Sequence, residues 1–473
     1  MTRLLSICLF LLAFQLLNSH SQAQIAYQHA TYKNFYIGTY GRIGADWSFV
    51  NEGSIGRRLN LNNMGSIGGR MEEQDYLELA TGIDFSPLIK GDSMNVTVNT
   101  RFAVWSNSLS LFGNSTTTST GGLTLAIPEL YVEVTGVGKR DRVNLWVGSR
   151  LYRGADVHIA DHFYFNDHSG QGFGVELKST RFAAIFVSST DTSSTVPPYF
   201  YLNIKTGTPA LALRQRTVLV LEQDKVLSES SKLTFLAEYH RMGNPDVTDT
   251  LPDLAYPGDH GYVLGARLNT ILPKLPMGSF NDVSIRYGRG IANGGDGGVS
   301  RTWLTFGAPD LVDQSFSKAY SWSLVDHILL NLSERFSLNG YVIYNRSKGA
   351  AASDDMAETF FGKEVFNKKE DLTLGTRGTW YISDNFHLLS ELHYSQRRDG
   401  EQPTYAMGKF SLAPTLSVSG ERSVWARPHL RFVFSAARYN DNASEQLYSP
   451  YLQFVGAERW GYYMGVKAEW WIF

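Results

Sequence analysis

The sequence predicts an all-β fold, a transmembrane antiparallel β-barrel, and three observations support this. Apolar and polar side chains alternate along much of the chain, without the 3.6-residue period of amphipathic helices. Residues 1–23 have the features of an export leader, and no later stretch approaches the roughly 20 apolar residues that a membrane-spanning helix requires. The last strand alternates so that one face suits lipid and the other suits a polar lumen.

The leader is followed by one continuous domain. Arg3 gives the leader its positive start, residues 4–17 form its apolar run, and small residues end it, which together predict a secretory signal peptide. We expect residues 24–34 to form a short periplasmic segment and residues 35–473 to form a single barrel. The whole would then lie in a bacterial outer membrane as a multi-pass β-barrel.

Composition narrows the classes of function. The chain has 43 basic and 45 acidic residues, which gives no sign of nucleic-acid binding. Its only cysteine, Cys8, lies in the leader, so the mature chain would hold no disulfide and no thiolate metal site. A mean hydropathy of −0.20 is compatible with a barrel, because an apolar outer face and a polar inner face average out. The 13% of aromatic residues suit interface girdles, although a secreted β-rich enzyme would share them.

The first and last strands show the alternation most clearly. In the first strand, one face carries Phe35, Ile37, Ile43, Ala45 and Trp47, and the other carries Tyr36, Tyr40, Arg42 and Asp46. In the last strand, one face carries Tyr462, Met464, Val466, Ala468, Trp470 and Ile472, and the other carries Gly465, Lys467, Glu469 and Trp471. A chain that ends in such a strand is expected to close its barrel at the terminus.

Further strands are expected between these two. Alternating runs occur around residues 77–81, 94–105, 130–134, 143–147, 233–239, 283–287, 386–394 and 424–439, and turn-forming clusters at 107–122, 290–299 and 345–355 separate some of them. Roughly 450 mature residues accommodate 16 to 18 strands of about 10 residues with their turns and loops. Twenty-two strands with an N-terminal plug would need more chain than this.

Several motifs carry a resemblance to a known family. Residues 148–161 read Gly-Ser-Arg-Leu-Tyr-Arg-Gly-Ala-Asp-Val-His-Ile-Ala-Asp, and Tyr164, Asp167 and Ser169-Gly170 follow. Other matches are Tyr40-Gly-Arg42, Asp75-Tyr-Leu-Glu78, Ser423-Val-Trp-Ala-Arg-Pro428 and Glu469-Trp-Trp471. The set resembles the maltoporin (sugar porin) family at both ends and in the middle. It implies an eighteen-stranded barrel with an inward-folded constriction loop, a homotrimer in outer-membrane lipid, and passive diffusion of oligosaccharides without cofactor or catalysis.

The resemblance also implies which residues meet the sugar. The aromatic slide would comprise Tyr40, Tyr76 and Trp471, with Trp380 and Phe112 towards its ends. The polar track and constriction would comprise Arg42, Glu78, Asp161, Tyr164, Asp167, Arg150 and Arg153. Alternation supports part of this independently, since Tyr40 and Arg42 share the polar face of the first strand. A pyranose has apolar C–H faces and a rim of hydroxyls, so stacked rings and charged groups together suit it.

The sequence departs from the family pattern at a few positions. Gly154 stands where the family carries a track arginine, and Arg150 or Arg153 would supply the charge instead. Pro128 replaces another track arginine, Val283 replaces a slide phenylalanine, and Phe163 is an alternative to Tyr164 at the constriction. Arg57, Arg58 and Arg70 are open to interpretation as loop charges or as subunit contacts.

Other interpretations remain beside this one. Six residues in the constriction segment could suggest a metal site or, alternatively, a hydrogen-bonded network that holds the loop: Asp156, His158, Asp161, His162, Asp167 and His168. His168-Ser169 resembles the His and Ser of barrel phospholipases, but neighbouring strand residues point to opposite faces. A porin without sugar affinity, a lipid hydrolase and a structural or adhesive barrel are the alternative functions.

Overall fold

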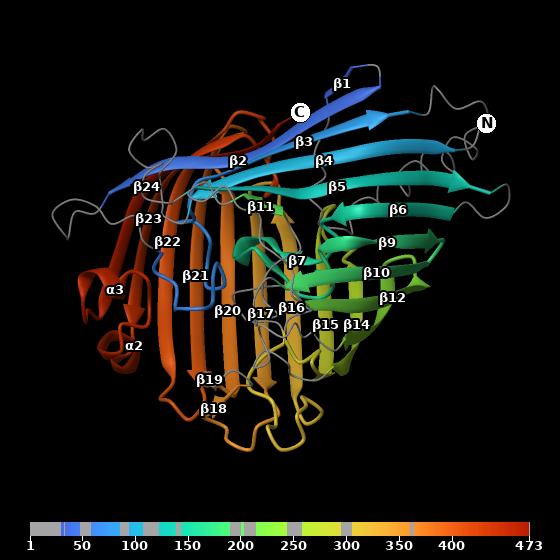
Figure 1. Cartoon of the computed structure of the whole chain (residues 1–473). Helices are drawn as coiled ribbons and strands as arrows, with labels where there is room; N and C mark the ends of the chain where they lie inside the picture. The colour runs from blue at the N-terminus through green and yellow to red at the C-terminus, as the bar shows by residue number, and fades with distance from the viewer. Residues whose placement is uncertain are drawn as a thin grey trace.

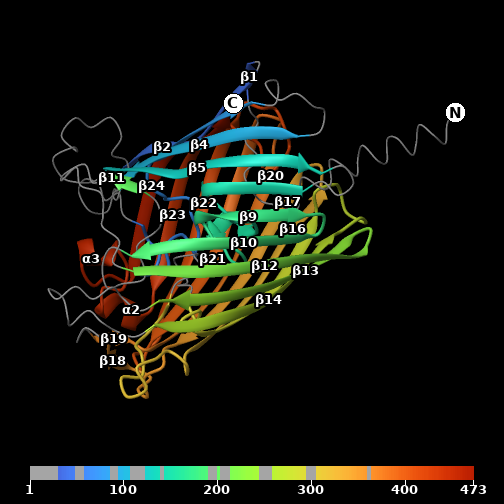
Figure 2. The same cartoon turned by 45° about the vertical axis from the view of Figure 1, so that its right-hand side comes forward.

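The computed structural model describes residues 30–32, 34–47, 58–85, 94–106, 123–138, 143–189, 200–202, 214–243, 258–294, 305–359 and 364–472. Within these residues, eighteen strands form one closed antiparallel barrel (Figures 1 and 2). This confirms the predicted fold class and the strand number that the family resemblance implied. Phe112 lies outside the described residues.

The eighteen wall strands follow one another in chain order. They are β2 (Phe35–Trp47), β3 (Tyr76–Asp84), β4 (Asn95–Ser106), β5 (Leu123–Val137), β6 (Val143–Arg150), β9 (Gly170–Leu177), β10 (Thr180–Ser189), β12 (Arg214–Ser228), β13 (Ser231–Met242), β14 (Asp259–Ile271), β15 (Phe280–Gly290), β16 (Tyr320–Ser333), β17 (Phe336–Lys348), β20 (Lys368–Tyr381), β21 (Phe386–Asp399), β22 (Tyr405–Ser417), β23 (His429–Tyr439) and β24 (Trp460–Ile472).

Shorter elements decorate this wall. They are β1 (Ala30–Tyr32), β7 (Asp156–Val157), η3 (His158–Ala160), β8 (His162–Phe163), β11 (Phe200–Leu202), β18 (Met356–Glu358), β19 (Glu364–Phe366), α2 (Asp441–Glu445) and α3 (Leu452–Val455). None of the helices in the described parts of the chain has the length and apolar character needed to cross a membrane.

The first and last wall strands close the barrel. In β2 and β24, Thr39 lies opposite Ile472, and the pairing continues to Trp47 opposite Met464. Each wall strand therefore has a partner on both sides, which leaves no open sheet edge. The alternation along β24 follows the prediction: Lys467 and Glu469 are buried inside the barrel, at 3% and 2% exposure.

The outer face of the wall is apolar. Large apolar side chains point outward from strands all around the barrel, including Phe102, Leu130, Leu264, Leu392 and Leu430, each at least 47% exposed. The inner face carries the polar partners of the same strands. Such a surface is stable where hydrocarbon, and not water, surrounds the barrel.

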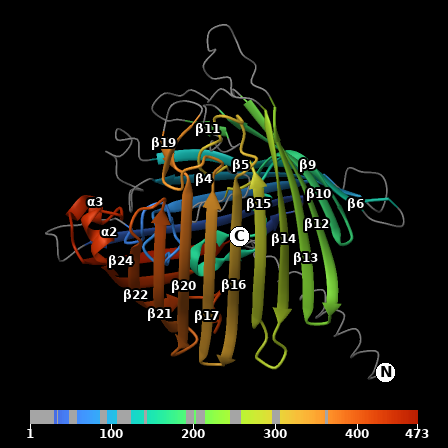
Figure 3. The same cartoon turned by 90° about the horizontal axis from the view of Figure 1, so that it is seen from below.

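The loop between β6 and β9, residues 151–169, folds into the barrel and is here called the constriction loop. Figure 3, seen from below, shows its short elements inside the ring of strands. Its buried Val157, Ile159 and Phe165 belong to one apolar cluster with wall residues such as Val218 and Val325. Burial of these side chains against inward-facing aliphatic residues explains why the loop leaves the barrel mouth and packs on the wall.

A buried ionic network adds to this packing. Glu238 of β13 is 3% exposed and lies 3.0 Å from His168 of the constriction loop. The same carboxylate receives Arg286 at 2.9 Å and His240 at 2.8 Å. One buried carboxylate on the wall therefore contacts His168 of the constriction loop as well as two wall residues, and this contact helps to hold the loop against the wall.

A second loop also folds inward, which the sequence did not predict. Residues 58–75, here called the first loop, bury five apolar side chains: Leu59, Leu61, Met64, Ile67 and Met71. Gly68 N–H donates to Tyr341 Oη at 3.3 Å, and Lys409 Nζ donates to Asn60 Oδ1 at 2.7 Å and forms an ion pair with Glu72. The bore is therefore narrowed by two loops.

Candidate functional site

A line of aromatic rings runs across four neighbouring wall strands. Trp105 of β4, Tyr76 of β3, Tyr40 of β2 and Trp471 of β24 all face the barrel interior, in the order of the strands. Their successive ring centroids are 6.2, 5.8 and 6.5 Å apart, and the first and last of these pairs are stacked. Trp105, Tyr76 and Trp471 are partly exposed, whereas Tyr40 is only 4% exposed, so the other three rings make up the accessible apolar surface of the line.

Two further rings extend this line. His158 of the constriction loop lies 6.0 Å from Trp471, and Trp425 lies 5.2 Å from His158. Trp425 belongs to the turn between β22 and β23, residues 418–428, and its side chain is exposed. Trp105 and Trp425 were not assigned from the sequence, although Trp105 stands on the polar face of its strand and Trp425 within a quoted motif.

Charged groups border the rings. The Tyr40 hydroxyl accepts from Arg42 Nη1 at 3.1 Å and Arg70 Nη2 at 2.8 Å, and donates to Glu469 Oε1 at 3.2 Å. Both arginines also reach Glu73 Oε2, at 3.0 and 3.1 Å. Burial would raise the pKa of Glu73, but the neighbouring arginines outweigh burial and lower it to about 2. Glu73 is therefore ionised at any physiological pH.

A second ionic group lies at the other end of the aromatic line. Arg101 Nη1 lies 2.6 Å from Glu78 Oε2, and its Nε lies 2.5 Å from Glu129 Oε2. The Tyr76 hydroxyl donates to Glu78 as well. Arg42 Cζ lies 5.1 Å above the Tyr76 ring, so Arg42 connects the two ionic groups.

The two aspartates predicted for the constriction lie in different surroundings. Asp161 is exposed at the end of η3 and interacts electrostatically with Arg42 and Arg70. Asp167 is only 3% exposed and accepts from the backbone N–H and the hydroxyl of Ser169, at 3.2 and 2.6 Å. These contacts place Asp161 on the open side of the loop, whereas Asp167 lies within it.

The predicted constriction aromatics are also buried. Tyr164 is 3% exposed and is influenced by Asp282 and Arg267 of the wall, and Phe163 is 7% exposed. Arg153 lies with its Cζ 4.0 Å above the Phe163 ring. The three side chains consequently contribute to the packing of the constriction loop.

Arg150 lies away from the aromatic line, at the end of β6. Its Cζ is 5.1 Å from the ring centroid of Tyr131, 5.4 Å from that of Trp146 and 5.8 Å from that of Tyr152. Glu133 lies 3.6 Å from its Nη1. Arg150 is thus held between aromatic rings and carboxylates on the inner wall.

Trp380 lies outside the barrel, which corrects its prediction as a slide residue. It is 40% exposed and packs on Phe336 with ring centroids 5.0 Å apart. Its neighbour Tyr381 is the inward-facing residue, at 3% exposure. The prediction was wrong by one position, and a shift of one residue in a strand moves a side chain to the opposite face. Trp380 belongs to the outer aromatic surface.

The histidines and carboxylates of the constriction loop are directed to other partners. Within the described residues, no group of three or more His, Cys, Asp or Glu side chains is arranged to hold a metal ion. His168 faces Glu238, and Ser169 donates to Asp167, so His168 and Ser169 do not form a base and nucleophile pair.

Comparisons with known proteins agree with this architecture. Three solved structures are matched, each with a TM-score below 0.5, and the assignment to a family does not depend on them. Wzi, an outer-membrane protein involved in group 1 capsule assembly in Escherichia coli, is 9% identical, with 91% of this chain and 83% of that chain covered and a TM-score of 0.42. OpdL and OccK8 (OprE) of Pseudomonas aeruginosa are 6% and 7% identical, each with 93% of this chain and 98% of that chain covered and a TM-score of 0.43.

The family match extends over nearly the whole chain. The model described as LamB porin matches residues 35–471, from the first wall strand to the last. The match begins at the predicted start of the barrel and includes every residue of the aromatic line. The chain therefore belongs to the LamB porin family, the maltoporin family, and is an outer-membrane β-barrel.

Proposed function

We propose that the protein is a sugar-selective porin that allows passive, facilitated diffusion of maltodextrin-like oligosaccharides. The observation that carries this proposal is the continuous line of Trp105, Tyr76, Tyr40 and Trp471 with ionic groups along its edge. Sugar faces would stack on the rings while hydroxyls exchange hydrogen bonds with Arg42, Glu78 and Asp161 as the chain slides.

The chemistry of such a path favours movement over trapping. Each ring contact is weak and resembles the next, so a sugar that leaves one ring gains another at little net cost. Tight binding at one point would slow release and reduce flux. This mechanism needs no cofactor and no covalent step, and we infer that the protein is a channel and not an enzyme.

Three further inferences complete the proposal. We infer that residues 1–23 are removed as a signal peptide and that residues 24–34 form a short periplasmic segment before the barrel. We also infer a homotrimer in outer-membrane lipid. N-terminal sequencing of the exported protein should begin at Gln24, and sedimentation of the detergent-solubilised protein should give three chains per particle.

Conductance in a planar bilayer tests the proposed function. Added maltohexaose should reduce the single-channel current in a saturable way, because a bound sugar occupies the bore. Conductance that no oligosaccharide reduces would indicate a porin without sugar affinity. Release of fatty acid from phospholipid would instead support a lipid hydrolase, and the absence of any conductance would favour a structural barrel.

A further inference from the structure

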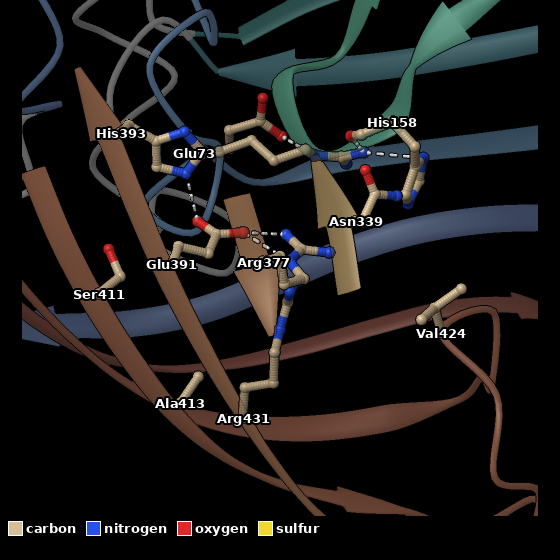
Figure 4. Close-up of polar contacts among 12 residues, drawn as sticks. Glu73, His158, Asn339, Arg377, Glu391, His393, Ser411, Ala413, Val424 and Arg431 are labelled. Atoms are coloured by element: carbon tan, nitrogen blue, oxygen red, sulfur yellow. Dashed lines mark hydrogen bonds and ion pairs between the residues drawn. The ribbon is translucent and has the colours of Figure 1, made fainter. Parts of the chain in front are cut away.

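Four arginines gather on the inner wall beside the Trp471 end of the aromatic line. We call them the arginine cluster: Arg70 of the first loop, Arg377 of β20, Arg427 of the turn 418–428 and Arg431 of β23. Figure 4 shows Arg431 extending from the wall towards Arg377. Four separate elements therefore direct cationic groups to one place.

A single carboxylate serves three of these arginines. Glu469 Oε2 lies 2.9 Å from Arg431 Nη2 and 3.2 Å from Arg427 Nη2, and Glu469 Oε1 lies 3.4 Å from Arg70 Nη2. Arg377 forms its ion pair with Glu391, and that carboxylate also meets His393 at 3.1 Å. Because Arg70 is also paired with Glu73, Glu469 is left to balance Arg427 and Arg431 with a single negative charge.

The excess of positive charge persists when the neighbours are included. Among the described residues, six arginines interact here: Arg42, Arg58, Arg70, Arg377, Arg427 and Arg431. Four carboxylates face them: Glu73, Asp161, Glu391 and Glu469. Glu72 lies nearby but is paired with Lys409. Lys467, with Asp46 and Asp75, adds one positive and two negative charges beside Arg42 and Arg431, so the region retains one positive charge.

Two buried donor atoms in the arginine cluster have neither a hydrogen-bond partner nor an ion-pair partner among the described residues, whereas Arg377 Nη2 is paired with Glu391. The two atoms are Arg427 Nε and Arg431 Nε, on side chains that are only 3% and 7% exposed. A buried donor without an acceptor costs free energy. Burial, opposed by Glu469 and reinforced by the other three arginines, lowers the pKa of Arg427 to about 10. An anion at this place would supply both the missing charge and the missing acceptors.

The arginine cluster adjoins the proposed sugar path. Arg427 Cζ lies 4.5 Å above the Trp471 ring, and His158 and Trp425 continue the rings beyond it. A pyranose stacked on the Trp471 surface would therefore bring its ring substituents to the guanidinium groups. Guanidinium binds carboxylate, sulfate and phosphate oxygens through charge-assisted hydrogen bonds.

We propose that the arginine cluster binds an anionic substituent of an oligosaccharide, so that the channel prefers acidic saccharides to neutral ones of equal length. This proposal rests on the proposed function, because it assumes that saccharides pass along the aromatic line. A purely structural role would be to hold Glu469 of β24 against the first loop and β23. The two roles differ in whether the charge of the saccharide affects block of the channel.

The wild-type channel provides the first test. Half-blocking concentrations would be measured in planar bilayers for maltohexaose and for maltohexaose that carries one 6-carboxylate, one 6-sulfate or one 6-phosphate group. At 0.1 M KCl, at least one anionic form should block at about a tenfold lower concentration than neutral maltohexaose. The three anionic forms identify which group the arginines prefer. At 1 M KCl the advantage should shrink, because the screening length falls to about 3 Å.

Variants then locate the effect. Arg431→Gln should remove most of the advantage of the anionic sugar, and Arg431→Lys should retain part of it because the charge remains. Arg459→Gln is the matched control, since Arg459 is 64% exposed and pairs with the exposed Asp441 of α2. Should Arg431→Gln fail to fold, Arg427→Gln takes its place. The comparison of neutral and anionic maltohexaose on the wild-type channel still tests whether the channel prefers acidic saccharides.

The outcomes separate the two proposals. Equal block by neutral and anionic maltohexaose would overturn the acidic-saccharide proposal and leave the sugar porin standing. An anionic advantage that survives Arg431→Gln and Arg427→Gln would likewise overturn the assignment to this cluster. Conductance without block by any of the four sugars would overturn the proposed function itself.

Discussion

At the scale of single residues, Tyr40 combines the two chemistries that a sugar path requires. Its ring lies between those of Tyr76 and Trp471, and its hydroxyl bonds Arg70 and Glu469. The apolar face and the ionic edge are therefore held in fixed relation by one side chain. Replacing Tyr40 would disturb both, so Trp471 is the cleaner position for testing the ring contribution.

Trp471→Ala should weaken block by maltohexaose about 2- to 13-fold, which corresponds to roughly 0.5 to 1.5 kcal/mol for one stacking ring. Ion conductance should change little, because the polar edge remains. Trp470→Ala is the matched control: the same substitution one residue earlier, on the opposite face of β24. Equal effects of the two substitutions on the block constant would place Trp471 off the sugar's route.

Asp161→Asn should shift ion selectivity towards anions. Asp161 is exposed on the constriction loop and opposes Arg42 and Arg70, so its loss increases the positive potential of the bore. The reversal potential under a KCl gradient measures this shift. Asp441→Asn, in the exposed α2, serves as the control. An unchanged reversal potential in Asp161→Asn would show that Asp161 does not line the narrowest part of the bore.

Alternation along strands made much of the residue-scale picture predictable. Tyr40, Tyr76 and Trp471 were placed on inner faces because they share faces with charged residues. Trp380 was misplaced because the sequence alone leaves the strand register uncertain by one residue, and that difference reverses the face. Trp425 could not be placed by alternation at all, because it lies in a turn.

At the scale of elements, the constriction loop depends on the buried charge of Glu238. Glu238→Gln should weaken loop docking by about 1.5 to 3 kcal/mol, because His168 of the loop would lose the buried carboxylate that it contacts on the wall. Trypsin cleavage after Arg153 should then become faster, as followed by mass spectrometry. Glu445→Gln on exposed α2 is the control. Wild-type cleavage rates in Glu238→Gln would show that apolar packing alone holds the loop.

Docking of the constriction loop should also depend on pH through Asp156. Burial, with the nearby charge of Asp161, raises the pKa of Asp156 to about 8, from about 3.9 in an exposed chain. The docked loop therefore binds this proton more tightly, and docking weakens as pH rises between these values. His158 does not titrate in the upper part of this range, because burial and Arg70 hold its pKa well below the usual value.

Open-channel current noise measures this pH effect. Noise should increase between pH 6 and pH 9 in the wild type, as ionisation of Asp156 loosens the loop. Asp156→Asn cannot ionise and should show much less change over the same interval. A wild-type channel with equal noise at both pH values would contradict the assignment.

The two inward loops differ in how far the sequence reveals them. The constriction loop was predicted because its motif resembles that of a known family. The first loop was not, because its contacts are made with residues far along the chain, such as Tyr341 and Lys409. Neither its apolar residues nor its glycines indicate, by themselves, which wall they will meet.

At the scale of the whole molecule, closure of the barrel creates the site. The aromatic line crosses the junction where β2 pairs with β24, so residues from the two ends of the chain become neighbours there. The barrel class follows from alternation, and the strand number of eighteen follows from the family resemblance and chain length. The excess of arginine charge in the bore could not be foreseen, since its members come from four separate elements.

The central claim is that oligosaccharides travel along the rings of this junction. An experimental structure of the protein with bound maltohexaose tests it most directly. The account predicts pyranose faces stacked over Trp471, Tyr76 and Trp105, the partly exposed rings of the line, with hydroxyls directed to Arg42 and Glu78. Sugar bound against the opposite wall, with these rings uncovered, would contradict it.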